Sequence, residues 1–341
     1  MRRLLNTLYV TGPDSYLARD GENVVVRVAE EVKLRIPVHN LEGIVCFGYA
    51  GASPSLMSLC CERGVGLSFL TEHGRFLARV SGTVSGNVLL RRHQHRRTED
   101  LEASNNLAKH FVVAKIHNSR TSLQRAVRDH VHTQEPLSVA IKTLSNVISR
   151  VTNSPDLDVL RGLEGEAAAE YFGVFDHLIV AQKEEFSFSR RVRRPPTDKV
   201  NAMLSFLYTL LAHDAASALE TVGLDPQMGF LHRDRPGRAG LALDLMEELR
   251  PYLADRLVLT MINRRQVTAD GFLQKENGAV IMDPSTRKAV LEAWQKRKQE
   301  EIEHPFLNEK IPIGLLPYTQ AMLLARYLRG DLDDYPPFFW R

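Results

Sequence analysis

The chain has 341 residues, of which 44% are hydrophobic and 25% are charged. This size and composition predict a globular protein with one large domain or two smaller ones, and they exclude a largely disordered chain. Three cysteines, Cys46, Cys60 and Cys61, are too few and too poorly spaced for a zinc site or a disulfide framework, so we expect a reducing, cytoplasmic location. The apolar run near the N-terminus is too short for a signal peptide, and no stretch has the ~18 uninterrupted apolar residues of a membrane span.

Positive charge is concentrated in three short segments, although 44 basic and 41 acidic residues leave a net charge of only +3. These segments are residues 91–97, residues 190–199 and the loop that follows His232. Each one alone is equally compatible with a solvated loop. All three are rich in arginine, whose guanidinium group binds phosphate in bidentate fashion, so together they favour a polyanionic partner.

Residues 1–85 predict a β-rich domain. Short segments such as NVVVRV, VKLRIP and GLSFL are rich in β-branched and aromatic residues and are separated by Gly, Pro, Asp and Asn. One helix is expected at 53–63, because Ser53 is a suitable N-cap and Pro54 stands at the first helical position.

Residues 98–341 predict a larger α-helical domain, joined to the first by a basic linker at 86–97. Helical periodicity is seen over 106–131, 155–183, 198–222, 241–262, 285–303 and 319–329. The dipeptide Asn277-Gly278 between two apolar runs predicts one β-hairpin within this half. The expected fold class is therefore α+β, and the aromatic residues of the proline-rich C-terminal segment are expected to pack on the protein's own core.

Glu164 lies in the helical segment RGLEGEAAAEYF, at 161–172. At about 100° per residue it falls on the apolar face, whereas the other two glutamates of the segment point away. An ionised carboxylate there needs a cation or strong hydrogen bonds. The flanking Gly162 and Gly165 indicate the close approach of a backbone or a ligand. A structural ion pair with Arg161, or with an arginine of another helix, explains Glu164 equally well.

His232 follows the apolar residues Phe230 and Leu231 and precedes a polar loop. This position allows the imidazole to face a surface cleft from the end of a buried segment. Imidazole is a good ligand for borderline metals and a suitable acid or base near neutral pH. A single histidine, however, more often has neither role.

The segment LALDLMEELRP, at 241–251, places Asp244, Glu247 and Glu248 at positions i, i+3 and i+4 of a helix. Three like charges on one face repel one another. Either the face is solvated, or a divalent cation relieves the repulsion, since Mg²⁺ and Mn²⁺ prefer carboxylate oxygens.

One Glu, one His and an acidic helix near arginine-rich loops predict a site for metal-dependent phosphodiester chemistry. The sequence contains no Walker-type glycine loop, no Gly-x-Ser-x-Gly motif and no His-Glu-x-x-His helix, so those reaction classes lose support.

As an ordered set, these motifs resemble the CRISPR-associated integrase family, the universal adaptation nuclease of CRISPR systems. The resemblance spans nearly the whole chain, and within the family the chain is most similar to the branch that accompanies type I-C systems. It implies an N-terminal β-domain and a C-terminal helical domain. The matching segments are IVCFG at 44–48, GRF at 74–76, RGLEG at 161–165, DKVNAMLSF at 198–206, GFLH at 229–232 and DLMEELRP at 244–251.

The resemblance also implies the site residues. The metal ligands carried over are Glu164, His232 and Glu247, with Asp244 adjacent, and the metal is Mg²⁺ or Mn²⁺. The last ligand is often Asp in relatives and is Glu here, which leaves the choice among the three acids of that helix open. The arginines expected to contact DNA are Arg193, Arg194, Arg233, Arg235 and Arg238.

The activity implied is a transesterification in which the 3′-hydroxyl of a short DNA fragment attacks a phosphodiester at the edge of a CRISPR repeat. The family acts as a homodimer bridged by a small ferredoxin-like adaptation subunit, with residues 1–85 expected to supply dimer and partner contacts. No membrane partner is expected. Two alternatives stay open: a metal-dependent nuclease of branched DNA or RNA that does not join fragments, and a non-catalytic DNA-binding scaffold whose acidic helix is solvated.

Overall fold

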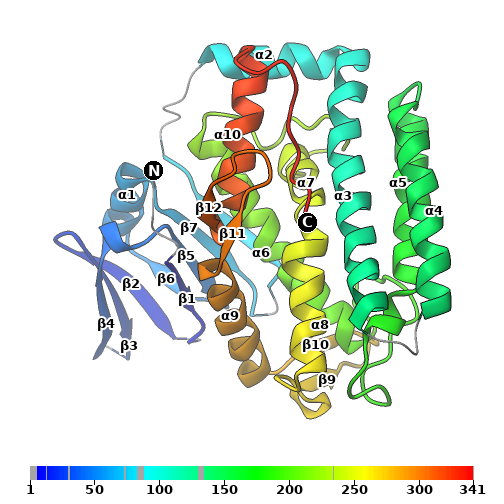
Figure 1. Ribbon diagram of the computed structural model, residues 1–341. Helices are drawn as coiled ribbons and strands as arrows, with labels where there is room; N and C mark the ends of the chain where they lie inside the picture. The colour runs from blue at the N-terminus through cyan, green and yellow to red at the C-terminus, as the bar shows by residue number, and fades with distance from the viewer. Residues whose placement is uncertain are drawn as a thin grey trace. The chain divides into compact units, whose positions relative to one another are not determined.

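The computed structural model describes residues 6–340, apart from residues 13, 30, 73, 83–87, 130–133 and 233. The chain divides into two compact units (Figure 1). One comprises Met1–Ser85 and Arg287–Gln299, and the other comprises Gly86–Thr286 and Glu300–Arg341. Strands dominate the first unit and helices the second, so the predicted α+β class is confirmed.

The first unit contains two four-stranded sheets, ordered β1-β5-β7-β8 and β4-β3-β2-β6. In the first sheet β1, β5 and β7 are parallel and β8 is antiparallel to β7. Helix α1 begins after Ser53, whose hydroxyl accepts a bond from the Leu56 N–H at 3.3 Å, and it packs on β2 and β7. The bounds are β1 Thr7–Val10, β2 Ser15–Asp20, β3 Asn23–Val28, β4 Glu31–Pro37, β5 Gly43–Phe47, β6 Gly51–Ala52, α1 Pro54–Arg63, β7 Gly66–Leu70, β8 Phe76–Val80 and α9 Pro284–Gln299.

The second unit is built from helices and two short hairpins. Helices α3, α4 and α5 pack against one another and stand side by side in Figure 1. Its bounds are α2 Val88–Glu99, α3 Leu101–Asp129, α4 Gln134–Thr152, α5 Leu157–Gly173, α6 Lys199–Thr221, α7 Gly240–Glu247, α8 Arg256–Asn263, β9 Phe272–Gln274, β10 Val280–Met282, β11 Glu301–Glu303, β12 Lys310–Pro312 and α10 Leu316–Arg329.

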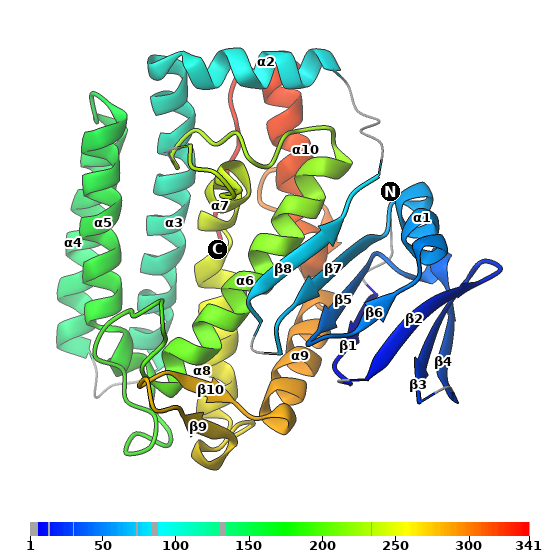
Figure 2. The same cartoon turned by 180° about the vertical axis from the view of Figure 1, so that it is seen from behind.

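Helix α6 forms the centre of the second unit. It packs against α7, α8, α10 and β10, and Figure 2 shows it running beside α7 and α8. Its length and hydropathy are those of a membrane span, but 61% of its most apolar window is buried inside the protein. This burial is typical of the core helix of a globular unit.

Three local predictions for the second unit need correction. Residues 88–97, expected to belong to a linker, form most of helix α2, because Leu90 and Gln94 are buried against the unit. The helix expected over 241–262 is divided at Pro251 by a π-helical turn, Pro251–Asp255, since proline has no N–H for the α-helical bond. A second hairpin, β11–β12, accompanies the predicted β9–β10 hairpin.

The C-terminal segment packs on its own core, as predicted. Tyr335, Phe338 and Trp340 are buried. Asn118 of α3 fixes the segment, because its amide donates to the Phe338 carbonyl at 2.9 Å and its oxygen accepts from the Trp340 N–H at 2.8 Å. The same amide donates to the Glu248 carbonyl at 2.7 Å, so the segment, α3 and the end of α7 are held together.

Candidate functional site

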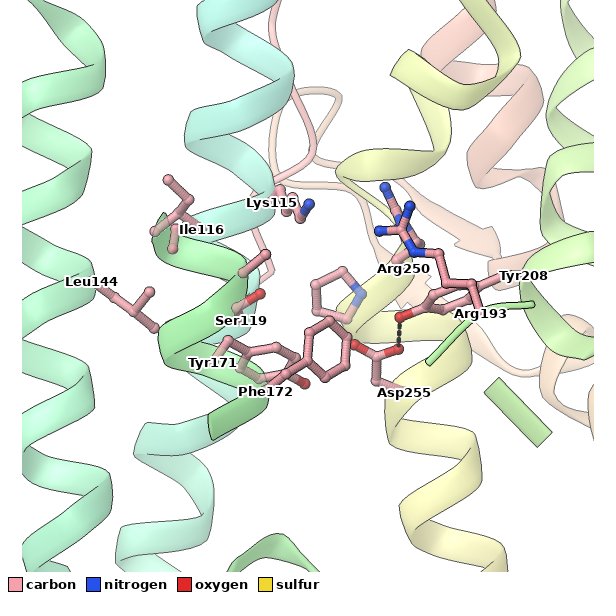
Figure 3. Close-up of a pocket in the computed structure, with 13 residues that line it drawn as sticks. Lys115, Ile116, Ser119, Leu144, Tyr171, Phe172, Arg193, Tyr208, Arg250 and Asp255 are labelled. Carbon is pink, nitrogen blue, oxygen red and sulfur yellow. Dashed lines mark hydrogen bonds between the residues drawn. The ribbon is translucent and has the colours of Figure 1, made fainter. Parts of the chain in front are cut away.

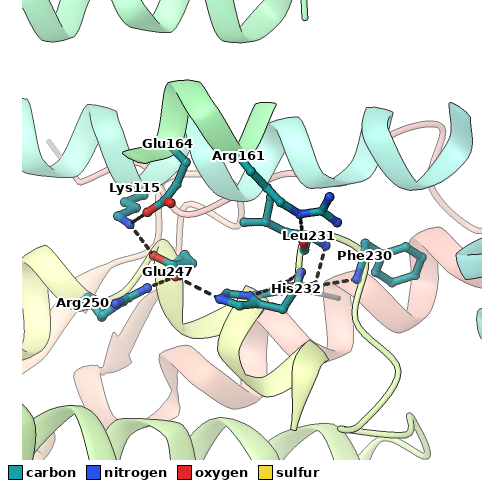
Figure 4. A network of polar contacts seen from close by, with 9 residues as sticks. Lys115, Arg161, Glu164, Phe230, Leu231, His232, Glu247 and Arg250 are labelled. Carbon is teal, nitrogen blue, oxygen red and sulfur yellow. Dashed lines mark hydrogen bonds and ion pairs between the residues drawn. The ribbon is translucent and has the colours of Figure 1, made fainter. Parts of the chain in front are cut away.

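Three elements of the second unit bring together the acids and the histidine singled out in the sequence (Figure 4). Glu164 lies in α5, His232 lies in the segment before α7, and Glu247 is the last residue of α7. Helix α5 begins at a defined point because the Asp156 carboxylate accepts from the N–H groups of Asp158 and Val159, both at 2.9 Å. These side chains are 68 and 15 residues apart along the chain, and only the fold makes them neighbours.

Asp244 holds His232 in place. Its carboxylate is completely buried and accepts from three consecutive backbone N–H groups, those of Phe230 at 2.6 Å, Leu231 at 3.0 Å and His232 at 3.1 Å. One of its oxygens also lies 2.6 Å from Nδ1 of His232. A carboxylate at Nδ1 favours the tautomer that carries the proton there, which leaves Nε2 with a free lone pair.

Nε2 of His232 faces Glu247, with 3.8 Å between Nε2 and Oε1. Glu247 is almost fully buried and also pairs with Arg250, one turn further along the chain. Its other oxygen, Oε2, lies 2.9 Å from Nζ of Lys115. No donor among the described residues is aligned with Oε2 as a hydrogen bond, so this buried oxygen keeps unused acceptor capacity.

Lys115, in α3, joins Glu164 to Glu247. Its ammonium donates a hydrogen bond to Oε1 of Glu164 and lies beside Glu247 at the same time. Figure 4 shows the ammonium group between the two carboxylates. The cation that accompanies Glu164 is therefore a lysine of another helix. Arg161, weighed as a partner from the sequence, instead pairs with Asp158 and donates to the Leu231 carbonyl at 2.8 Å, tying α5 to the histidine segment.

Burial and charge perturb this cluster. Burial is the main cause that lowers the pKa of Lys115 to about 8, and the nearby Arg250 charge lowers it further against the opposing effect of Glu164. Burial alone would raise the pKa of Glu164, but the charge and hydrogen bond of Lys115, with Arg250 and His232, lower it overall. The Glu164 carboxylate is thus held in its ionised form, which is the form that can bind a cation.

The three acids of the 241–251 segment are all buried, so the alternative of a solvated acidic face is wrong. They also diverge in role. Glu248 follows the end of α7 and points to the C-terminal segment, where it accepts from the Tyr335 hydroxyl at 2.5 Å and the Phe338 N–H at 2.6 Å. Since Asp244 is fully engaged by His232 and its neighbours, Glu247 is the acid of the three that faces Glu164 through Lys115.

The donor set suits a divalent cation of the Mg²⁺ or Mn²⁺ type. Two carboxylates flank the Lys115 ammonium, the imidazole nitrogen Nε2 of His232 faces one of them, Glu247, and one Glu247 oxygen has spare acceptor capacity. Within the described part of the chain, however, no group of three His, Cys, Asp or Glu side chains is closed into a metal site. Lys115 lies between the two carboxylates. The ligand assignment stays a prediction.

The arginines expected to contact DNA lie partly around this cluster. Arg193, Arg194 and Arg235 are exposed, and Arg238 is half-buried. Burial is the main cause that lowers the pKa of Arg238, and the charges of Arg235, Arg193 and Arg161 lower it further against the opposing effect of Asp244. Arg233 lies outside the described residues.

Two expectations about α5 have opposite outcomes. Glu166 is exposed and pairs with Arg150 at 2.6 Å, as the helical phase predicts. Gly162 and Gly165, by contrast, face open space, because a Cβ built on either would have no atom of the described residues within 4 Å. The expected close approach of a second backbone segment is therefore absent from the described part of the chain.

Comparison with known proteins identifies the family. Residues 8–296 match the family described as CRISPR associated protein Cas1. The chain is 53% identical, over the full length of both proteins, to the CRISPR-associated endonuclease Cas1 1 of Chlorobaculum tepidum.

Two solved structures share the fold at low sequence identity. A casposase bound to integration product superposes with a TM-score of 0.85 at 22% identity, covering 96% of this chain and 92% of that one. A chain of a Cas6-RT-Cas1–Cas2 complex gives 0.83 at 23% identity, covering 98% of this chain and 36% of that one. The motif order, the α+β fold and the full-length sequence match agree, and the chain belongs to the Cas1 family of CRISPR-associated endonucleases.

Proposed function

We propose that this protein is a metal-dependent DNA endonuclease and integrase of CRISPR adaptation. The observation that carries the proposal is that three ligand side chains meet in one largely buried cluster: Lys115 joins Glu164 to Oε2 of Glu247, and Nε2 of His232 lies 3.8 Å from Oε1 of the same Glu247. A site that gathers two carboxylates and an imidazole in one cluster has the ligand types that a divalent ion requires.

Glu164, Glu247 and Nε2 of His232 would hold the metal, which is Mg²⁺ or Mn²⁺. When bound, such an ion supplies charge stabilisation at the scissile phosphate. Asp244 is not proposed as a ligand, since both of its oxygens are taken by the His232 segment. Its role is to fix the tautomer and orientation of His232.

The reaction is a transesterification. A 3′-oxygen of a DNA fragment forms a new bond to phosphorus at the edge of a CRISPR repeat, while the bond from that phosphorus to the 3′-oxygen of the repeat strand breaks. The proton of the attacking hydroxyl passes to solvent or a base, and the leaving oxygen takes one up. The side chains of Arg193, Arg194, Arg235 and Arg238 would position the phosphate backbone without reading the base sequence. Hydrolytic cleavage uses water in place of the hydroxyl.

The partners proposed are short DNA duplexes, repeat DNA, a second copy of this chain and a small ferredoxin-like adaptation subunit. The fold neighbours described as a casposase with its integration product and as a Cas1–Cas2 complex support DNA and subunit partners by analogy of fold. We place the chain in the branch that accompanies type I-C systems on its sequence motifs. Residues 1–85 are proposed to contribute to the homodimer and to partner contacts.

The test is a strand-transfer assay with a labelled duplex fragment, a supercoiled plasmid carrying the repeat, and Mn²⁺. Glu164→Ala and His232→Ala should abolish the joined product. Glu166→Ala is the matched control, because this glutamate lies on the same helix but is exposed and paired with Arg150. A joined product that persists in both site variants would remove these residues from the chemistry. Cleavage without any joined product in the wild-type protein would instead favour the nuclease alternative.

A further inference from the structure

Lys115 occupies an unusual position for a lysine. Its side chain is only 10% exposed, and its ammonium contacts one carboxylate on each side of the candidate metal position. A second cation, Arg250, pairs with the same Glu247 carboxylate. The buried Glu247 carboxylate and the half-buried Glu164 carboxylate are therefore balanced by two largely buried cations, which satisfies the requirement that buried charges be paired.

A pocket adjoins this cluster and shares its cations (Figure 3). It opens to solvent, and Lys115 and Arg250 both belong to its wall together with Arg193. Figure 3 shows Tyr208 beside these cations and hydrogen-bonded to Asp255, and the Arg250 guanidinium lies over the Tyr208 ring, 5.2 Å from its centre.

The third cation, Arg193, is exposed and comes from one of the arginine-rich loops. The charge of Arg193 acts on both buried cations. Burial is the main cause that lowers the pKa of Lys115 and of Arg250, and the Arg193 charge lowers both pKa values further. Mutual repulsion among three cations around one pocket is relieved by an anion.

Metal binding changes this charge balance. A divalent cation held by Glu164 and Glu247 competes with Lys115 for the same carboxylate oxygens and repels its ammonium group. Lysine has a flexible four-carbon stem, so the ammonium group can move while α3 stays in place. The adjoining pocket is the open space next to it, and once Glu164 and Glu247 are bound to the metal, Asp255 is the carboxylate among its lining residues that faces the three cations.

We propose that Lys115 is a resident counter-cation that holds the metal position in the metal-free protein, and that metal binding turns it into the pocket, where Lys115, Arg250 and Arg193 bind a phosphate group of DNA. This inference rests on the proposed function and adds a coupling between metal binding and DNA binding. Metal binding and DNA binding then strengthen each other, and by linkage the effect is reciprocal. The protein would engage DNA firmly only when its metal is present.

The test measures two affinities of the full-length protein. Mn²⁺ affinity is followed by electron paramagnetic resonance without DNA, and the affinity for a labelled DNA duplex is followed by fluorescence anisotropy at fixed salt, with and without Mn²⁺. In the wild-type protein, Mn²⁺ should raise DNA affinity by about 5-fold or more, the lower range of ordinary coupling between sites. Lys115→Met should bind Mn²⁺ several-fold more tightly than the wild type, because no ammonium competes, and should lose most of the Mn²⁺-induced gain in DNA affinity.

Two further variants test whether the effect of Lys115→Met comes from the pocket. Arg193→Met, at an exposed position, should keep the wild-type Mn²⁺ affinity and reduce the Mn²⁺-induced gain. Lys142→Met, an exposed lysine of α4, removes the same charge away from the pocket and should change neither quantity. Inorganic phosphate is titrated at constant ionic strength; if it raises Mn²⁺ affinity as much as DNA does, the pocket binds free phosphate and the assignment to DNA is overturned.

The outcomes separate this inference from the proposed function. Weaker Mn²⁺ binding by Lys115→Met would mean that Lys115 positions the carboxylates and does not compete with the metal. An unchanged gain in DNA affinity in Lys115→Met would exclude the pocket as a phosphate site. Either result overturns the inference while strand transfer by the wild-type protein, if present, still supports the proposed function. If the wild-type protein binds no Mn²⁺, both fail.

Discussion

Replacing Asp244 by asparagine should weaken metal binding without touching a proposed ligand. Both carboxylate oxygens accept two bonds each: one oxygen faces Nδ1 and the backbone N–H of His232, and the other faces the N–H groups of Phe230 and Leu231. Asparagine has one oxygen and one NH₂ group of nearly the same shape. Whichever way the amide is turned, its NH₂ group meets two groups that were donors.

The two orientations have different consequences. If the amide oxygen faces His232, the N–H groups of Phe230 and Leu231 lose their acceptor and the segment shifts. If the NH₂ group faces Nδ1, the imidazole must move its proton to Nε2, and the nitrogen that faces Glu247 can no longer bind a metal. Loss of two charge-assisted hydrogen bonds corresponds to about 3–6 kcal/mol of unfolding free energy. Loss of such a supporting contact typically weakens metal affinity by about 10- to 100-fold.

The assay combines chemical denaturation in chelator with Mn²⁺ titration under conditions where the variant is folded. Asp156→Asn is the matched control, because Asp156 accepts two backbone N–H groups as the N-cap of α5, a position where asparagine is as good as aspartate. The control should keep its stability within a few tenths of a kcal/mol and its Mn²⁺ affinity. If Asp244→Asn binds Mn²⁺ as tightly as the control does, Asp244 does not position His232 and the reasoning is refuted.

Three further predictions concern the surroundings of the site. Gly229→Ala should destabilise the protein by about 1–3 kcal/mol and weaken Mn²⁺ binding, because the new Cβ would lie 2.7 Å from the Gly240 backbone and 2.9 Å from the Asp244 carboxylate; unchanged denaturation and Mn²⁺ titration curves would contradict this. Gly162→Ala, where a Cβ meets open space, should instead stabilise α5 by up to about 1 kcal/mol in thermal unfolding; if DNA affinity falls while stability rises, the open space is used by DNA. Burial raises the pKa of Glu248 to about 7 against the hydrogen bonds it accepts, from an ordinary value of 4.5. A raised carboxyl pKa stabilises the fold at low pH, and this contribution is lost as pH rises through about 7. Between pH 5.5 and 7.5, the unfolding free energy of the protein in chelator should therefore fall by about 2 kcal/mol more in the wild type than in Glu248→Gln. If urea titrations at the two pH values give the same change in unfolding free energy for both proteins, this pKa is not raised.

The sequence predicts the ligand-bearing elements better than it predicts their partners. Helical phase places Glu164 on the inner side of α5 and Glu166 outside, because a phase depends only on residues within one helix. The partner of Glu164 depends on how α3 packs against α5, 49 residues away, and no local pattern specifies it. A signal was present, since Lys115 interrupts the apolar run FVVAKI, but a lysine in such a run is also typical of a side chain that reaches solvent.

The acidic segment shows the same limit. The spacing of Asp244, Glu247 and Glu248 predicts one shared face, and this would hold for an uninterrupted helix. The helix ends at Glu247, so Glu248 turns toward Tyr335 and Phe338 of the C-terminal segment, and Asp244 is taken by the His232 segment. The spacing of the acids therefore identifies the helix that carries a site residue, and only tertiary contacts distinguish the roles of its three acids.

The most direct test of the metal centre is a crystal structure of the full-length protein with saturating Mn²⁺, in which anomalous scattering locates the ion independently of any assumption about its ligands. We predict one peak at about 2 Å from oxygens of Glu164 and Glu247 and from Nε2 of His232, with Nζ of Lys115 moved away from between the carboxylates. A structure in which Lys115 still joins Glu164 to Glu247 and the ion lies elsewhere, or binds through Asp244 or Glu248, would contradict it.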